Sequence, residues 1–347
     1  MQRRVHSRPP RSRLCVLPSP RLLPLILRSG RAPAMSLGPG TSELTPTMLD
    51  PPRMPARVDT VRAQFDRIAP RFGAHDAVLR EVERRLIERL EMIRLAPARI
   101  VDVGCGAGHS RALLAARFAQ ATWIGVDVSP RMLAHGAAPR GLRERLMPWR
   151  APGAQRVCAD AAALPLADDA VDLVYSNLML HWHPAPHTLF PEFRRVLSTD
   201  GLLMFSCFGP DTLKELRAAC AQALPQARPL PFVDMHDFGD MLVASGFATP
   251  VMDVEVLRLT YASPQDLLRE VRALGANPRD DRARALPSGR QARALLDALQ
   301  AQRDADGRIG LTVEVAYGHA WKPAPRPPRG NTVSIALDDV RARLRQR

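Results

Sequence analysis

Several features are absent from this sequence of 347 residues, and each absence narrows the class of protein. No run of about 18 consecutive apolar residues occurs, so we expect no membrane span and no membrane partner. The five cysteines are scattered, with no CxxC pair and no histidine-rich spacing near them. This pattern argues against a zinc site and against a disulfide framework, and it fits a reducing cytosol. We therefore expect a cytoplasmic protein that holds no metal.

Aromatic residues make up only 5% of the chain, and acidic residues are missing from its first 34 positions. So few aromatic side chains supply a poor platform for stacking nucleic-acid bases. The net charge of +14 would otherwise suggest a nucleic-acid partner, but residues 1–34 contain eight arginines and no acid. More than half of the net charge therefore belongs to this short segment, and we expect no nucleic-acid partner.

Residues 1–57 form a head rich in arginine and proline, which we expect to be disordered because it cannot bury enough apolar surface. Two interpretations of the head remain open. An Arg-rich, acid-poor segment is typical of a transit peptide. Alternatively, the head is upstream sequence translated from a start codon placed too early, with Met35, Met48 or Met54 as the true start. The prolines favour the second interpretation, because they would break an amphipathic helix.

The chain from residue 58 to residue 323 alternates between strand and helix patterns, and the tail at 324–347 is expected to be mostly flexible. The predicted strands are RIVDVG (99–104), TWIGVDVS (122–129), QRVCAD (155–160), VDLVYSNL (171–178), LLMFSCF (202–208), VMDVEVLRLTYA (251–262) and GLTVEVAYGHAWK (310–322). This alternation predicts an α/β fold with a doubly wound parallel sheet. The final strands predict an antiparallel addition at one edge. Helices precede the first strand, and a helical insertion at about 264–306 precedes the last one.

Polar residues near the ends of predicted elements indicate where two helices begin and suggest a structural role for one aspartate. Ser129 followed by Pro130 suits the N-terminus of the helix after the second strand. Asp211 is expected to cap the helix after the fifth strand, with Glu215 completing much of a capping pattern. Asp172, in the fourth strand, is expected to cap the sheet rather than to contact a ligand.

Three glycines at alternate positions, Gly104, Gly106 and Gly108, follow the first strand. A strand that runs into a glycine-rich turn and then a helix is typical of ligand binding at the carboxyl edge of a sheet, since glycine lets the main chain touch the ligand. The phosphate-loop pattern GxxxxGK[ST] is missing, and GxGxG departs from the dinucleotide pattern GxGxxG. Asp102, just before the turn, would repel a pyrophosphate. A ligand that is cationic or carries an amino acid fits better.

The segment VDVGCGAG resembles the first motif of class I S-adenosylmethionine-dependent methyltransferases, and CADAAALPLADDAVDLVYSNLMLHW resembles their next motifs. The resemblance implies a Rossmann-like, seven-stranded methyltransferase sheet and S-adenosyl-L-methionine as the methyl donor. It implies that Asp127 accepts the ribose hydroxyls, that Asp160 faces the adenine amino group and that Ala161 supplies a backbone amide. The full set of cofactor-binding candidates is Asp102, Gly104, Cys105, Gly106, Asp127, Val128, Asp160, Ala161 and Asn177.

Four longer stretches resemble the malonyl-acyl-carrier-protein O-methyltransferases of biotin synthesis, over roughly residues 58–323. They are FDRIAPRFGAHDAVLREV, SNLMLHW, FSCFGPDTLKELRAA and VRALGANPRDDR. The resemblance implies methyl-ester formation on the free carboxyl of a malonyl thioester, with acyl carrier protein as the partner. The ester masks a charge, so that the chain can be elongated toward pimelate. A carboxylate is already ionised at pH 7, so the site needs alignment more than a base.

A carboxylate substrate calls for a cation, best an arginine fork. The candidates are Arg279 and Arg282 in the late insertion, with Arg71, Arg194 and Arg195 as weaker alternatives that are more typical of a solvated surface. Because the carrier protein is expected to be acidic, a basic rim formed by the insertion would also steer it toward the site.

Two departures from the family pattern leave the catalytic assignment open. Phe72 stands where the family usually has tyrosine, so no hydroxyl contact is carried over and a lid wall is the remaining role. His181 stands where the biotin enzymes commonly have glutamine, and it could be a base, a substrate contact or a buried, hydrogen-bonded histidine. Phe72 and His181 are therefore the catalytic candidates.

LHW and FGPDTLKELR also resemble a mitochondrial complex I assembly factor that acts as a protein-arginine hydroxylase. Two alternative functions follow: a cofactor-binding protein that modifies arginine or assists assembly, and a methyltransferase acting on a small acceptor such as a quinone precursor. The oligomeric state is not indicated by the sequence.

Overall fold

The structure is a computed structural model. It describes residues 56–74, 76–136, 155–273, 275, 277–281 and 287–325. Almost all of the predicted head and of the predicted tail lie outside the described residues.

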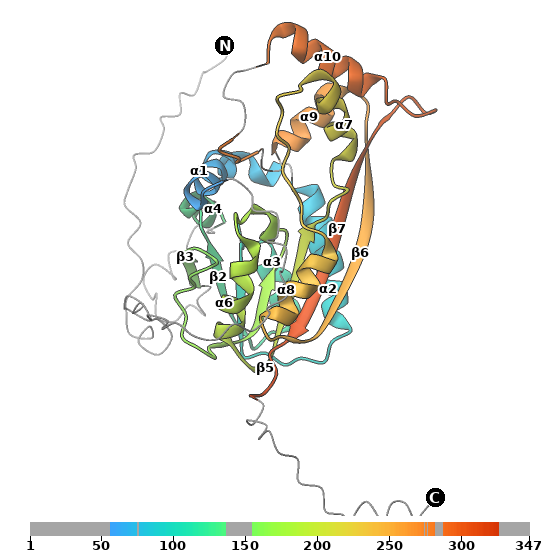
Figure 1. Ribbon diagram of the computed structural model, residues 1–347. Coiled ribbons are helices and arrows are strands. Elements are labelled where there is room, and N and C mark those ends of the chain that lie inside the picture. The colour runs from blue at the N-terminus through green and yellow to red at the C-terminus, as the bar shows by residue number, and fades with distance from the viewer. Residues whose placement is uncertain are drawn as a thin grey trace, which may run out of the picture.

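Seven strands of the described chain form one sheet in the order β3-β2-β1-β4-β5-β7-β6 (Figure 1). They are β1 (Arg99–Val103), β2 (Thr122–Asp127), β3 (Gln155–Cys158), β4 (Val171–Ser176), β5 (Leu197–Phe208), β6 (Ala248–Tyr261) and β7 (Ile309–Trp321). β1 to β5 run parallel, whereas β7 is antiparallel to both of its neighbours, β5 and β6. The predicted doubly wound sheet with an antiparallel last strand is therefore confirmed.

Burial explains why the strands differ in sequence pattern. In β1 every residue after Arg99 is buried, which matches a continuous apolar run covered on both faces. β6 lies at the edge and alternates along most of its length between half-buried and exposed side chains, as expected for a strand with one face toward solvent. The continuous apolar pattern of β1 and the alternating pattern of β6 thus indicate a central strand and an edge strand, respectively.

Helices cover both faces of the sheet (Figure 1). They are α1 (Val58–Ile68), η1 (Ala69–Ala74), α2 (Ala77–Glu91), α3 (Ser110–Arg117), α4 (Pro130–His135), η2 (Leu180–Trp182), η3 (Pro186–Thr188), α6 (Leu189–Val196), α7 (Lys214–Ala223), α8 (Met235–Ala244), α9 (Pro264–Ala273) and α10 (Gly289–Gln300). One core cluster includes Phe190 of α6 and Phe238 of α8. A second, on the other face, includes Leu86 of α2 and Leu114 of α3.

The helices between β6 and β7 pack at one end of the sheet, as Figure 1 shows. Leu267 of α9 and Leu299 of α10 share a buried cluster with Ala219 of α7 and with Ile309 and Leu311 of β7. The predicted helical insertion before the last strand is therefore present and has its own small apolar core.

The capping predictions had different outcomes. Ser129 caps α4, since its hydroxyl accepts from the Met132 N–H, and Pro130 follows at the first helical position, as predicted. The prediction for Asp211 is wrong, because α7 begins at Lys214 and the residue before it, Leu213, has a positive φ of 60°. The first turn of α7 is tied to β7 instead, because Glu215 accepts from the backbone N–H and the hydroxyl of Thr312.

Asp172 caps the end of the sheet, as expected. Its Oδ2 accepts from the backbone N–H groups of Ala98 and Arg99 at 2.9 and 3.0 Å, and its Oδ1 accepts from Ser198 Oγ at 3.0 Å. These bonds join the start of β1 to β4 and β5, so this acid serves the fold.

Candidate functional site

A cleft opens at the carboxyl ends of β1, β2 and β4, where ligands bind in doubly wound sheets. Its empty volume, counted out to its open mouth, is about 860 Å³. Of the predicted candidates, Gly104, Gly106, Asp127 and Val128 line it from the ends of β1 and β2. Asp160, Ala161 and Asn177 line it from the segments that follow β3 and β4. The fold thus brings together residues that are far apart in the sequence.

The glycine-rich turn needs glycine for both conformation and space. Gly104, Gly106 and Gly108 all have positive φ values, of 77°, 53° and 82°. A Cβ atom at Gly104 would lie 2.3 Å from the Met179 side chain, which also lines the cleft. A side chain at this position would therefore push Met179 into the space where a ligand binds.

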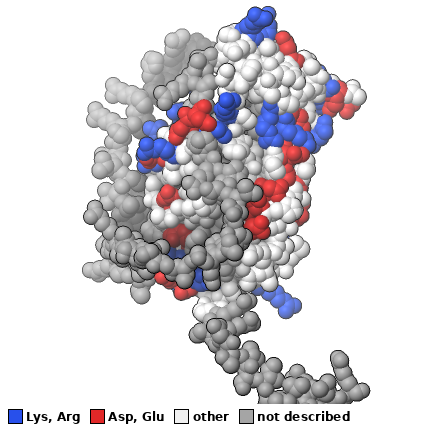
Figure 2. Space-filling view, in the orientation of Figure 1, with Lys and Arg blue, Asp and Glu red and all other residues white. Residues whose placement is uncertain are grey.

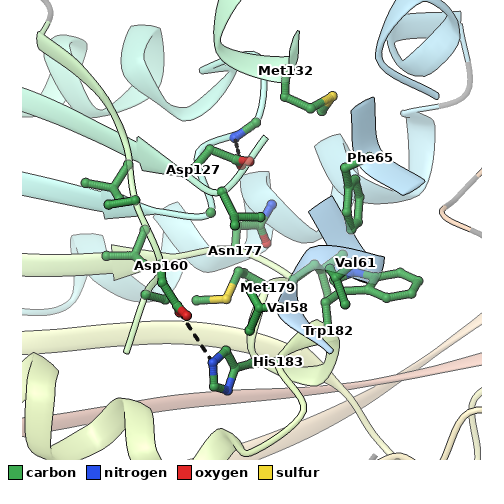
Figure 3. Close-up of a pocket in the computed structure, with 18 of the residues that line it drawn as sticks. Val58, Val61, Phe65, Asp127, Met132, Asp160, Asn177, Met179, Trp182 and His183 are labelled. Atoms are coloured by element: carbon green, nitrogen blue, oxygen red, sulfur yellow. Dashed lines mark hydrogen bonds and ion pairs between the residues drawn. The ribbon is translucent and has the colours of Figure 1, made fainter. Parts of the chain in front are cut away.

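Asp127 is held rigidly at the end of β2 (Figure 3). Its Oδ2 accepts from the Gly106 N–H and its Oδ1 from the Ser129 N–H, both at 2.8 Å. Burial raises the pKa of Asp127 to about 6, while the two backbone donors act in the opposite direction. Each oxygen of this carboxylate keeps a lone pair that can accept from a hydroxyl group in the cleft.

Asp160 faces a histidine that the sequence analysis did not single out, His183 (Figure 3). Asp160 Oδ1 accepts from the Ala162 N–H at 2.9 Å and lies 3.4 Å from His183 Nε2. The Ala185 N–H donates to His183 Nδ1, which leaves Nε2 as the ring nitrogen on the side of Asp160. His183 is the largest cause that lowers the pKa of Asp160, so this carboxylate stays ionised.

Asn177 ties the tip of β4 to its neighbours. Its Nδ2 donates to the Leu79 carbonyl at 3.2 Å, and its Oδ1 accepts from Ser206 Oγ at 2.7 Å. Both ends of the amide are therefore bonded within the protein, and Asn177 presents a fixed surface to the cleft.

Apolar side chains of the N-terminal helices form the opposite wall of the cleft. Val58, Val61 and Phe65 of α1 line it together with Phe72 and Trp182 (Figure 3). The rings of Phe65 and Trp182 meet edge to face with centroids 5.3 Å apart. Phe72 is thus a wall residue, in line with the lid role left open for it. The part played by α1 was not predicted, although Val58, Val61 and Phe65 follow helical spacing.

Asp102 and Cys105 border a second cavity, of about 410 Å³, rather than the main cleft. Asp102 is 2% exposed and accepts from the Ser110 hydroxyl. Burial raises the pKa of Asp102 to about 7, and burial likewise raises the pKa of the Cys105 thiol. The two cavities share Gly104, Gly106 and other lining residues, so they adjoin at the glycine-rich turn.

His181 lies beneath the cleft and does not line it. Its side chain is buried between the rings of Trp182 and Phe208, with centroid distances of 5.0 and 4.5 Å. The Phe208 N–H donates to its Nδ1 at 3.3 Å, and burial lowers its pKa to about 3. Of the three roles considered, this geometry matches the buried, hydrogen-bonded histidine. Its Nε2 has no partner among the described residues, but the ring does not border the cleft, and a base must reach the substrate.

The arginine candidates within the described residues do not line the cleft. Arg279 borders neither cavity, and its guanidinium binds Asp281, with Nε to Oδ1 at 2.7 Å, and the Pro229 carbonyl. Arg282 lies outside the described residues. Arg195 is paired with Glu192 and Asp168. On the face seen in Figure 2, basic and acidic side chains are intermingled.

Within the described residues, no helix has the length and apolar character needed to cross a membrane. Over the same residues, no group of three or more His, Cys, Asp or Glu side chains is arranged to hold a metal ion.

Comparison with known proteins first defines the class. A family model described as a methyltransferase domain matches residues 101–205, which run from β1 into β5. With the sheet order and the glycine-rich cleft, this match defines the chain as a class I S-adenosylmethionine-dependent methyltransferase. A malonyl-[acyl-carrier protein] O-methyltransferase of Laribacter hongkongensis is 46% identical over 285 residues, 81% of this chain and 93% of the relative. The chain belongs to the malonyl-[acyl-carrier protein] O-methyltransferase family.

Further comparisons give two more similar proteins. A second relative with the same description, from Methylovorus sp., is 44% identical over 270 residues, which are 77% of this chain and 89% of the relative. Among solved structures, phosphoethanolamine N-methyltransferase 2 of Haemonchus contortus, in complex with S-adenosyl-L-methionine, is 18% identical with a TM-score of 0.46. That match covers 76% of this chain and 60% of the other.

Proposed function

We propose that this enzyme transfers a methyl group from S-adenosyl-L-methionine to the free carboxyl of a malonyl thioester on acyl carrier protein. The product is the methyl ester that starts pimelate and biotin synthesis. The observation that carries this proposal is the extent of the match to the family. The general methyltransferase model ends at residue 205, whereas the relative from Laribacter hongkongensis matches over 285 residues. The similarity therefore extends into the segments that distinguish one methyltransferase from another.

The residues of the cleft fit the methyl donor, which supplies a methyl group on a positively charged sulfur. Asp127 is fixed by two backbone donors and keeps lone pairs for the ribose hydroxyls. Asp160 and the Ala161 backbone, which line the same cleft, would contact the edge of the adenine ring. Val128 and Met132 provide apolar surface for its faces.

Alignment and the exclusion of water are the tasks that remain for this chain during transfer. A malonyl carboxylate is ionised at neutral pH and attacks without losing a proton. His183, the one histidine among the described residues of the cleft, has both ring nitrogens directed at protein groups. The wall formed by Val61, Phe65 and Trp182 shields the reacting atoms from water and restricts their approach.

The partner and compartment follow from the same proposal. A substrate attached to a carrier makes acyl carrier protein the partner, and biosynthesis on such carriers belongs in the cytoplasm. The four cysteines in the described part of the chain are unpaired, in keeping with a reducing compartment.

The test is methyl transfer from labelled S-adenosyl-L-methionine to malonyl-carrier protein, with acetyl-carrier protein as the control. Base-labile label on the malonyl form alone is the expected result, because only this form has a free carboxyl. Label on both forms, or on neither while the donor still binds, would overturn the proposal. The second outcome would turn attention to a protein or a free small molecule as the acceptor.

A further inference from the structure

The second cavity lies between α2 and the glycine-rich turn. Arg80 and Glu83 border it from α2, Asp102 from β1, and His109 and Ser110 from the start of α3. Because it shares the glycine-rich turn with the main cleft, one ligand can extend from the cleft into this cavity. The lining of the cavity, unlike that of the apolar wall, is rich in charged groups.

Glu83 is the unusual residue of this cavity. Its side chain is 5% exposed, and within the described residues its carboxylate has neither a hydrogen-bond partner nor an ion-pair partner. Two other glutamates of the same helix, Glu81 and Glu88, are in contrast paired with Arg84 on the outer face of α2. Burying a carboxylate without a partner is costly, so this position calls for a cation that the chain itself does not supply.

The charges around Glu83 leave the cavity with an excess of acid. Asp76 is already paired, since its Oδ2 lies 2.8 Å from Arg80 Nε and 3.2 Å from His109 Nε2. Asp102, from β1, accepts from the Ser110 hydroxyl, and the neutral indole of Trp123 also acts to lower its pKa. Arg80 is therefore paired with Asp76. Within the described residues neither Glu83 nor Asp102 forms an ion pair, although the charges of Arg80 and Arg156 act on them from a distance.

We propose that Glu83 of α2 joins Asp102, already a cofactor-binding candidate, in binding the ammonium group of the amino-acid end of the methyl donor. This inference rests on the proposed function only in that the main cleft holds the adenosine end of the same molecule. α2 then contributes directly to the donor site, and Glu83 is a binding residue supplied by a helix outside the glycine-rich motif. A primary ammonium has three N–H donors, enough to reach both carboxylates and one carbonyl of the turn.

Proton release on binding follows from this arrangement. Burial, with a smaller contribution from the charge of Asp102, raises the pKa of Glu83, and burial raises the pKa of Asp102. Other titratable groups also act on this pair. They are Asp76 and Arg80 at the start of α2, Cys105 and His109 beside the glycine-rich turn, Tyr175 of β4, Asp127 at the end of β2, which raises the pKa of Asp102, and Arg156 of β3, which lowers it. In the free protein near neutral pH the pair retains a proton, and an incoming ammonium displaces it.

The experiment compares two ligands in titration calorimetry: S-adenosylhomocysteine, which has the amino-acid end, and 5′-methylthioadenosine, which lacks it. Glu83→Gln is expected to weaken binding of S-adenosylhomocysteine about tenfold and to leave 5′-methylthioadenosine unaffected, since a hydrogen bond to a charged group is lost for the first ligand alone. Glu88→Gln, on the exposed side of the same helix, is the matched control and should bind both ligands like the unchanged protein.

A second measurement determines how many protons are released when the ligand binds. Repeating the titration in buffers of different ionisation enthalpy should show release of about one proton when S-adenosylhomocysteine binds, and Glu83→Gln should remove most of this release. Equal loss of affinity for both ligands, unchanged affinity for both, or a release that persists in Glu83→Gln would overturn the assignment. No acceptor is present in these titrations, so an error in the proposed acceptor would leave their result unaffected.

Discussion

At the scale of single residues, the best-determined feature of the site is the carboxylate of Asp127. Two backbone N–H groups fix it, so its orientation does not depend on a ligand. Asp127→Ala is expected to weaken binding of S-adenosylmethionine by about 1.5–3 kcal/mol, the scale of lost hydrogen bonds to a charged group. Titration calorimetry measures this, with Asp237→Ala on the exposed start of α8 as the control. Unchanged affinity would show that the cofactor does not reach the end of β2.

The pair formed by His183 and Asp160 gives a second prediction at this scale. Removing the ring in His183→Ala takes away the main cause that lowers the pKa of Asp160 and frees its carboxylate to turn. Binding of S-adenosylmethionine should weaken by about 1 kcal/mol, the usual worth of one hydrogen bond. His236→Ala is a close control, because His236 also contacts an aspartate, Asp234, but is exposed and does not line the cleft. Equal affinities of the two variants would contradict the positioning role.

Glu83 should also affect the stability of the free protein. Burial raises its pKa from 4.5 to about 8, so the folded state binds this proton more tightly than the unfolded state does. The free energy of unfolding therefore falls as the pH rises between these two values. At about pH 9, Glu83→Gln should be more stable than the unchanged protein by roughly 2–4 kcal/mol, with little difference near about pH 5. Urea unfolding at both pH values measures it, and a difference that does not change with pH would refute the assigned cause.

At the scale of elements, the conformation of the glycine-rich turn affects both the stability of the fold and the binding of the cofactor. Gly104→Ala places a Cβ atom against Met179 in a backbone with φ of 77°, so we expect a loss of stability of about 1–2 kcal/mol together with weaker cofactor binding. Gly239→Ala in α8 is the contrasting change, since the nearest atom to its Cβ would be 3.8 Å away. That variant should be slightly more stable and bind normally. Thermal unfolding and calorimetry on both variants make the comparison, and normal binding by Gly104→Ala would contradict the close approach of the ligand to the turn.

The strands and the acids at their ends could be predicted from sequence because each rests on a local pattern. An apolar run such as that of β1 identifies a buried strand. Parallel strands bring Asp127 and Asn177, which follow two of them, to the same edge of the sheet regardless of the conformation of the connecting loops. The pairing of His183 with Asp160 could not be predicted, because the partners are separated along the chain and meet only after folding. The burial of Glu83 without a partner could not be predicted for a related reason. α2 contains several glutamates, and only the packed helix shows which of them faces inward.

At the scale of the whole molecule, all described residues that line either of the two cavities fall between Val58 and Phe208. The α9–α10 insertion reaches this region from the far end of the chain. Gly275 packs against the Trp182 ring, and Asp280 accepts from the Thr60 hydroxyl of α1 at 3.0 Å. The insertion therefore packs against the apolar wall through Trp182 and α1. We infer that α1 and the insertion together hold the wall at the mouth of the cleft.

This arrangement predicts which part of the chain the enzyme needs. Deleting residues 1–47 keeps α1, its contact with Asp280 and the whole lining of both cavities. The shortened protein should therefore match the full chain in melting temperature and in affinity for S-adenosylmethionine. Extending the deletion through Ile68 removes α1 and with it Val58, Val61 and Phe65, so cofactor binding should weaken and Trp182 should become exposed to solvent. Tryptophan fluorescence and calorimetry compare the two deletions, and a fall in stability already in the shorter one would show that the head packs against the folded domain.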